Sequence, residues 1–264
     1  MAVMNITPDS FSDGGSLYRD HVELDAVFAH AEQCLSEGAT ILDVGGESTR
    51  PGAKPVSDNE ELSRVIPVIE GLASRFDAMI SVDTSTPQVM IEAARAGAKL
   101  INDVRALQRE GAVAAALATN LPVCLMHMQG IPQTMQNQPD YDDAVMEVFQ
   151  WLMRRIDMCL DAGFLADQLL IDPGFGFGKM LQHNISLFHH LDRFVQTGYP
   201  VLVGVSRKSM IGEITGRPVE QRATASAVAA AIAASQGVAI LRVHDVSETR
   251  DAMVVMQTLT QGMQ

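Results

Sequence analysis

The sequence predicts an α/β fold in which a parallel sheet closes on itself. Short apolar runs recur along the chain, and each is followed by a longer segment with the apolar spacing of a helix. Eight such pairs fit within 264 residues, a normal length for eight strand and helix units. Polar side chains stand at the end of every run. These observations favour a single (β/α)₈ barrel, or TIM barrel, with its site at the carboxyl ends of the strands. A doubly wound open sheet is the alternative.

The expected elements follow the chain in strict alternation. The strands are expected at residues 2–4, 40–42, 79–82, 99–101, 122–126, 169–171, 201–205 and 238–243. The helices are expected at residues 22–36, 59–75, 87–96, 112–119, 142–162, 185–195, 220–235 and 246–259. No linker or repeat divides the sequence, so one domain covering residues 1–264 is expected. The long connections at 7–20 and 45–58 have the size of functional lids.

Composition narrows the class of function. A formal charge of −13 argues against a nucleic-acid or anionic-membrane surface, because both need clustered Lys and Arg. Cys34, Cys124 and Cys159 are an odd count without ligand spacing, so neither disulfides nor a zinc site are expected. Neither a signal-peptide pattern nor an apolar run long enough to span a membrane is present, which favours a soluble cytoplasmic protein.

Three of the polar strand ends suggest a ligand with several N–H donors. Asp83, Asn102 and Asp172 are expected to face one another across the barrel mouth, whereas any one of them alone could be a helix cap. Buried carboxylates are costly without donors, and the aminopyrimidinone edge of a guanine or pterin supplies adjacent N–H groups. Carboxylates also bind Mg²⁺, so a metal remains the alternative for this trio.

The segment DPGFGFGK at residues 172–179 is the strongest local signal. Its glycines permit close backbone approach, and Phe175 and Phe177 offer flat apolar walls for a flat ligand. Lys208, after the seventh strand, is either a Schiff-base nucleophile or a hydrogen-bond donor. The nearby carboxylates would keep it protonated, which favours the donor role.

A second group of residues suits an anion. Arg242 and His244 are two residues apart and therefore share one face of the last strand. Asn5 would lie beside them in a closed barrel. The three side chains fit phosphate oxygens and a Mg²⁺ ion.

These residues belong to segments that together resemble the dihydropteroate synthase family. The segments are NITPDSFSDGG at 5–15, DVGGESTRPG at 43–52, SVDT at 81–84, IND at 101–103, MHMQG at 126–130, DPGFGFGK at 172–179, GVSRKS at 204–209 and RVHD at 242–245. They follow the family's order and cover essentially the whole chain. The first two and the SRKS segment are the most specific.

The resemblance implies condensation of 6-hydroxymethyl-7,8-dihydropterin diphosphate with p-aminobenzoate, a transferase step of folate biosynthesis that releases pyrophosphate. The implied catalytic residues are Asp43, Asp83, Asp172 and Lys208. The implied pterin-binding residues are Asp83, Asn102, Met126, Asp172, Phe177, Gly204 and Lys208. Diphosphate would be held by Asn5, Arg50, Arg242 and His244, with Asn5 as the ligand of Mg²⁺. The p-aminobenzoate site would comprise Thr49, Pro51, Phe177, Lys208 and Ser209. The resemblance also implies a homodimer through the last helices.

Three other functions compete. A pterin-binding methyltransferase with a corrinoid partner would share the aspartate pocket, but it would not need residues 49–51 or Ser209. A catalytically silent pterin-binding subunit should lose the long loops or the Arg242 and His244 pair, which this chain keeps. A Schiff-base aldolase would depend on Lys208 as nucleophile.

Overall fold

The computed structural model describes residues 1–7, 22–48, 53, 56–130, 134–135 and 139–261. The strands are β1 (Ala2–Asn5), β2 (Ile41–Gly45), β3 (Met79–Asp83), β4 (Leu100–Asp103), β5 (Val123–Met126), β6 (Leu169–Asp172), β7 (Leu202–Val203) and β8 (Ile240–Leu241). The helices are α1 (Leu24–Ser36), α2 (Asp58–Arg75), α3 (Pro87–Ala96), α4 (Ala112–Thr119), α5 (Ala144–Ala162), α6 (Leu181–His189), α7 (Leu191–Val195), α8 (Ser209–Thr215), α9 (Ala223–Ser235) and α10 (Val246–Gln261). Short 3₁₀ turns cover Ala166–Gln168 and Val219–Gln221.

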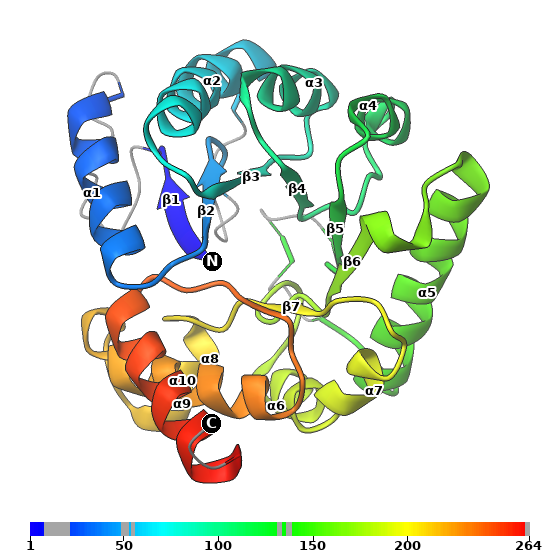
Figure 1. Cartoon of the computed structure of the whole chain (residues 1–264). Helices are drawn as coiled ribbons and strands as arrows, with labels where there is room; N and C mark the ends of the chain where they lie inside the picture. Colours follow the sequence, from blue (N-terminus) through cyan, green and yellow to red (C-terminus); the bar gives the residue numbers. More distant parts are fainter. Residues whose placement is uncertain (8–21, 49–52, 54–55, 131–133, 136–138, 262–264) are drawn as a thin grey trace.

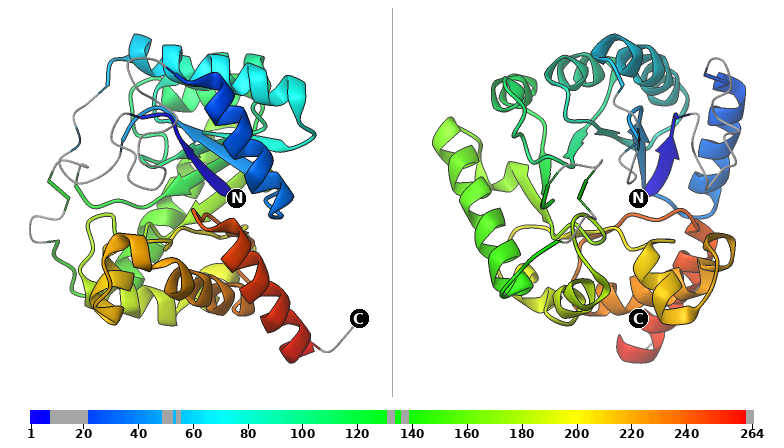
Figure 2. Two further views of the ribbon diagram at one scale, coloured as in Figure 1. Left: turned by 90° about the vertical axis from the view of Figure 1, so that its left-hand side faces the viewer. Right: turned by 180° about the vertical axis from the view of Figure 1, so that it is seen from behind.

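The strands form a closed parallel ring, which confirms the predicted barrel. Strands β1 to β6 pair in sequence order, and β7 pairs with β8. Single bridges join the two sheets at both seams, between Ile171 and Val201 and between Ala2 and Val243. The second seam is supported by a 3.0 Å hydrogen bond from Val3 N to Val243 O. The helices surround this ring in the view along the barrel and in the view from behind (Figures 1 and 2).

Most helix boundaries match the expected ones, because caps and apolar periodicity mark them in the sequence. Helix α2 begins after Ser57, whose hydroxyl accepts a hydrogen bond from Glu60 N, and α5 begins after Asp143, whose carboxylate accepts one from Met146 N. The expected helix at 185–195 is instead two helices, α6 and α7, that meet at His190. The seven-residue helix α8 was not expected, since it is too short to show a helical period.

The barrel interior is built in two layers, and the upper layer holds the polar residues. Four side chains of successive strands, Leu100, Cys124, Leu170 and Leu202, form an apolar cluster of their own. Side chains two positions further along a strand point the same way. The next layer toward the carboxyl end therefore contains, from the same strands, Asn102, Met126, Asp172 and Gly204. The polar side chains of the upper layer, Asn102 and Asp172, thus lie next to the apolar cluster on its carboxyl-end side.

The structure tests some of the expectations about the cysteines, about membrane-spanning helices and about the two long connections. Cys34, Cys124 and Cys159 are all buried free thiols. Among the described residues, no helix is long and apolar enough to cross a membrane. Most of the two long connections, including residues 8–21, lies outside the described residues, so their expected role as lids stays a prediction.

Candidate active site

Arg242 links two carboxylates across the barrel mouth. Its Nε donates to Asp43 Oδ2 at 2.6 Å, and its Nη2 donates to Asp83 Oδ2 at 2.8 Å. Asn102 Nδ2 donates to the same Asp43 oxygen at 3.1 Å. The four side chains come from β2, β3, β4 and the residue after β8, which are far apart in the sequence. They form one hydrogen-bonded cluster, which we call the arginine cluster.

The strand positions of Asp43 and Asn102 correct the expectation that both lie just past strand ends. Asp43 is the third residue of β2 and Asn102 the third of β4, so both are inside the barrel wall. Asp43 is completely buried, and its Oδ1 has no hydrogen-bond partner among the described residues. Asp43 therefore acts on the mouth indirectly. It accepts hydrogen bonds from Arg242 and Asn102 and so orients both side chains.

Asp83 combines burial with a nearby positive charge. Burial raises the pKa of the Asp83 carboxyl above its ordinary value, while the Arg242 guanidinium opposes that rise. The Arg242 guanidinium carries five N–H donors, and the two ion pairs use two of them. As far as the described residues show, donors thus remain on Arg242 for an anionic ligand at the mouth.

Asp172 and Lys208 form the second half of the site, on the loop side of the barrel. Asp172 Oδ1 accepts a hydrogen bond from Gly174 N at 2.7 Å. Lys208 Nζ donates to Phe175 O and lies 4.6 Å from the centre of the Phe177 ring. Burial lowers the pKa of Lys208 to about 8, partly opposed by Asp172, and burial raises the pKa of Asp172.

The two phenylalanines of the glycine-rich loop have different roles. Phe177 is half-buried beneath Lys208, and its role as a wall for a ligand stays a prediction. Phe175 is completely buried and packs against Phe188 at 5.8 Å between ring centroids, so its predicted role as a wall is wrong. Its backbone carbonyl, which accepts from Lys208, is the part of Phe175 that faces the site.

The other predicted residues occupy the rim. Ser206 Oγ lies 3.1 Å from His244 Nδ1 and accepts from His244 N, which fixes the imidazole near Arg242. Asn5 ends β1 beside Gly45 of β2, and its side chain is half-buried. Met126 is buried at the end of β5, and a Cβ on Gly204 would lie 3.7 Å from Arg242 Cβ and 3.9 Å from Lys208 Nζ. Ser209 is exposed at the start of α8. Thr49, Arg50 and Pro51 lie outside the described residues.

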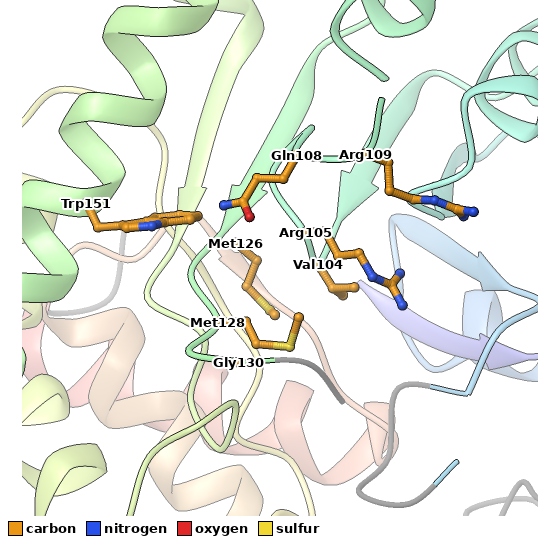
Figure 3. A pocket seen from close by; sticks show the side chains of 8 residues that line it. All are labelled: Val104, Arg105, Gln108, Arg109, Met126, Met128, Gly130 and Trp151. Atoms are coloured by element: carbon orange, nitrogen blue, oxygen red, sulfur yellow. The ribbon is translucent and has the colours of Figure 1, made fainter. Parts of the chain in front are cut away.

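A cavity of about 160 Å³ is lined in part by Met126. Figure 3 shows its lining, which comes from the end of β5, from the segment between β4 and α4, and from α5. The lining residues are Val104, Arg105, Gln108, Arg109, Met126, Met128, Gly130 and Trp151. Arg105 forms two hydrogen bonds to the Glu47 carboxylate, at 2.8 and 3.0 Å, so this wall is tied to the segment after β2.

Two buried groups near the mouth were not predicted from the sequence. Lys179 is 3% exposed and donates hydrogen bonds within the glycine-rich loop. Asp103 is fully buried and accepts from Ser85 and from the backbone N of Arg105 and Leu107. Both residues lie close in sequence to predicted site residues, Lys179 to Asp172 and Asp103 to Asn102, and that was the available signal. Charged residues are usually exposed, so their burial was not predicted.

Comparisons with known proteins agree with this geometry. A family model described as "Pterin binding enzyme" matches residues 1–244. The dihydropteroate synthase of Escherichia coli K12 is 53% identical over 257 residues, which cover 97% of this chain and 90% of that protein. A Yersinia pestis dihydropteroate synthase, solved in a sulfonamide drug complex, is 52% identical with a TM-score of 0.95, covering 99% of this chain and 94% of that one. The Xanthomonas albilineans enzyme, solved with 7,8-dihydropteroate, is 45% identical with a TM-score of 0.87, covering 100% and 94%.

Proposed function

The chain belongs to the family of pterin-binding enzymes and is a transferase with dihydropteroate synthase activity, and we propose that its barrel mouth is where the reaction occurs. The substrates are 6-hydroxymethyl-7,8-dihydropterin diphosphate and p-aminobenzoate, and the products are 7,8-dihydropteroate and pyrophosphate. The observation that carries the assignment of residues is the polar layer of the half-buried Asp83 with the buried Asn102 and Asp172, next to an apolar cluster inside the barrel. Residues 1–264 are proposed to form one domain.

The buried layer suits the edge of a pterin. Its amino group and adjacent ring N–H are donors, and Asp172 retains acceptor capacity beside its bond from Gly174 N. Lys208 can donate to a ring nitrogen or carbonyl oxygen, and the Phe177 ring beneath it offers a flat wall. Met126, buried at the end of β5, would pack against the ring, and Gly204 leaves space between Arg242 and Lys208.

The same residues stabilise the charge that develops during the reaction. When the bond between the exocyclic methylene and the diphosphate breaks, positive charge spreads from the methylene into the dihydropterin ring. Asp83 and Asp172 are proposed to lower the energy of that cation through the negative charge of their carboxylates. The neutral aniline nitrogen of p-aminobenzoate then attacks, and no strong general base is required. Thr49, Pro51, Phe177, Lys208 and Ser209 are proposed to form the p-aminobenzoate site.

Mg²⁺ is proposed to accompany the diphosphate. No cluster of three His, Cys, Asp or Glu side chains suited to a metal occurs in the described part of the chain. A Mg²⁺ carried by substrate phosphates needs few protein ligands, and the Asn5 side chain receives no hydrogen bond from the described residues, so its amide oxygen fits that role. When bound, the ion neutralises charge on the leaving diphosphate. Arg242, His244 and Arg50 are proposed to hold the same group.

A homodimer through α9 and α10 is proposed from the apolar side chains that these helices expose. The two helices pack together, and they expose Val228, Ile232, Val254, Val255 and Leu259, the last at 81%. An exposed apolar surface on neighbouring helices is typical of a subunit interface. Sedimentation of the purified protein tests this, because a monomer at micromolar concentration would contradict it.

The test of function is pyrophosphate release from dihydropterin diphosphate and Mg²⁺, with and without p-aminobenzoate. We expect release that depends on p-aminobenzoate and a drop of about a hundredfold in Asp172→Asn, since the amide cannot supply the negative charge. Asp167→Asn, a carboxylate change away from the mouth, is the matched control. A wild-type protein that binds pterin but releases no pyrophosphate would instead support a silent pterin-binding protein.

The alkaline limb of the pH profile tests the role of Lys208. Because the pKa of Lys208 is lowered to about 8, its ammonium loses a proton as pH rises through that value. We therefore expect kcat/KM to fall above about pH 8. In Lys208→Arg the side chain stays charged, so the limb should move upward even though the activity is lower. An alkaline limb that does not move in this variant would assign it to another group.

A further inference from the structure

The loop at residues 174–179 lies directly against the segment that follows β5. A Cβ on Gly174 would lie 1.8 Å from His127 O, and a Cβ on Gly178 would lie 2.4 Å from Gln129 O. Both glycines have positive φ, at +71° and +62°. The two backbones are therefore in contact at both ends of the loop, and something must fix their separation.

Lys179 lies between these two backbones. Its Nζ donates to Gly174 O at 2.8 Å and Phe177 O at 3.0 Å, and it lies 2.9 Å from His127 Nδ1 and 3.3 Å from His127 O. An ammonium has three protons, so these four neutral acceptors use its whole donor capacity. Lys179 is 3% exposed and has no proton left for a ligand.

The loop that Lys179 holds makes contact with two proposed catalytic groups. Gly174 N donates to Asp172 Oδ1, and Phe175 O accepts from Lys208 Nζ. Phe177 lies beneath the same ammonium of Lys208. A shift of the loop would therefore move the acceptor of Lys208 and the donor of Asp172 together.

We propose that Lys179 is a positioning residue, which fixes the glycine-rich loop to His127 and thereby sets the placement of Asp172 and Lys208. The proposal rests on the function proposed above for these two groups. It has a consequence that needs no turnover: the ammonium form of Lys179 cannot accept a hydrogen bond, so with that form His127 Nδ1 is the acceptor, and the imidazole is neutral with its proton on Nε2.

The fluorescence of Trp151 reports whether the His127 imidazole is neutral or protonated. It is the chain's single tryptophan, and its ring packs edge-on against His127 with 4.9 Å between centroids. Among the described residues, the titratable groups that face His127 are Lys179 and Tyr141. Burial lowers the pKa of Lys179, and the charge of Asp172 opposes that fall. Burial and the charge of Lys179 lower the pKa of His127 to about 2. Trp151 fluorescence should therefore stay constant between about pH 5 and 8 in the wild type, since protonated histidine is the quenching form.

The test compares Lys179→Met with Lys99→Met, which removes an exposed lysine. In Lys179→Met one cause of the low pKa of His127 is gone, so we expect its titration to move toward the ordinary value of about 6.5 and to quench Trp151 on acidification. The Kd for 6-hydroxymethylpterin, measured by calorimetry, should rise at least about tenfold, because Asp172 loses its fixed placement. Lys99→Met should match the wild type in both measurements.

Two results would overturn the proposal. One is a folded Lys179→Met protein with wild-type pterin affinity, even if its thermal stability is reduced. The other needs no variant and applies if Lys179→Met does not fold: a wild-type His127 that titrates between about pH 5 and 8 in nitrogen-detected NMR spectra. A wild type with neutral His127 that binds pterin yet forms no dihydropteroate would contradict the proposed function alone.

Discussion

Replacing Arg242 with methionine should lower kcat/KM by about a thousandfold and destabilise the protein by about 3–5 kcal/mol. The arginine cluster explains both effects. Asp43 and Asp83 each form an ion pair with the same guanidinium, and Asp43 is completely buried. Methionine fills much of the volume but leaves two buried carboxylates without a counter-charge, and it removes the donors proposed for the diphosphate.

The pH dependence of this loss distinguishes charge from packing. Burial already raises the folded-state pKa of Asp83 to about 7, and without the opposing charge of Arg242 it should rise further. Stability falls with rising pH between the unfolded-state and folded-state pKa values of Asp83, so in the variant this fall should continue above about pH 7, where it ends in the wild type. Urea unfolding of Arg242→Met at several pH values measures this. Arg95→Met, at a side chain that is 71% exposed, is the control.

A double variant completes the argument. Adding Asp83→Asn to Arg242→Met removes one unpaired charge, so it should recover part of the stability without recovering activity. If the double variant were less stable than Arg242→Met, the ion pair between Arg242 and Asp83 would not be the source of the destabilisation.

The sequence was sufficient to predict the barrel and which residues face its interior. Each strand alternates in a two-residue period, so Leu100 and Asn102, or Leu170 and Asp172, must lie on one face. The predicted positions of the polar residues along the barrel axis were less accurate. Asp43 and Asn102 are strand residues rather than loop residues, because polar side chains inside the wall are stabilised by Arg242, which lies 199 positions from Asp43.

Side-chain directions within the loops could not be predicted in this way. Phe175 and Phe177 each stand between two glycines in the sequence, yet only Phe177 faces the site. The loop has no regular period, and its conformation is set by partners distant in sequence, such as Lys179 and His127, which are 52 positions apart. The ion pair between Arg105 and Glu47, 58 positions apart, could not be predicted for the same reason. Of these two residues, Arg105 lines the cavity beside Met126.

Replacing Gly174 with alanine should destabilise the protein by about 3 kcal/mol or more and abolish measurable pterin binding. The new Cβ would lie 1.8 Å from a backbone oxygen, His127 O, at a φ of +71°. Neither backbone can retreat easily, because Gly174 N is bonded to Asp172 and Gly174 O accepts from Lys179. Displacing Gly174 therefore breaks the contacts that fix Asp172.

Gly216→Ala separates the clash from the strain of a positive φ. Gly216 has a φ of +69°, nearly the same as Gly174, but nothing lies within 4 Å of an added Cβ. Its substitution should cost only about 1 kcal/mol, measured by urea unfolding, and leave the Kd for 6-hydroxymethylpterin unchanged. The difference between the two variants isolates the contact with His127. Equal losses in both would mean that the loop moves away from β5 at little cost, and the close approach of the two backbones would then not be what holds Asp172 in place.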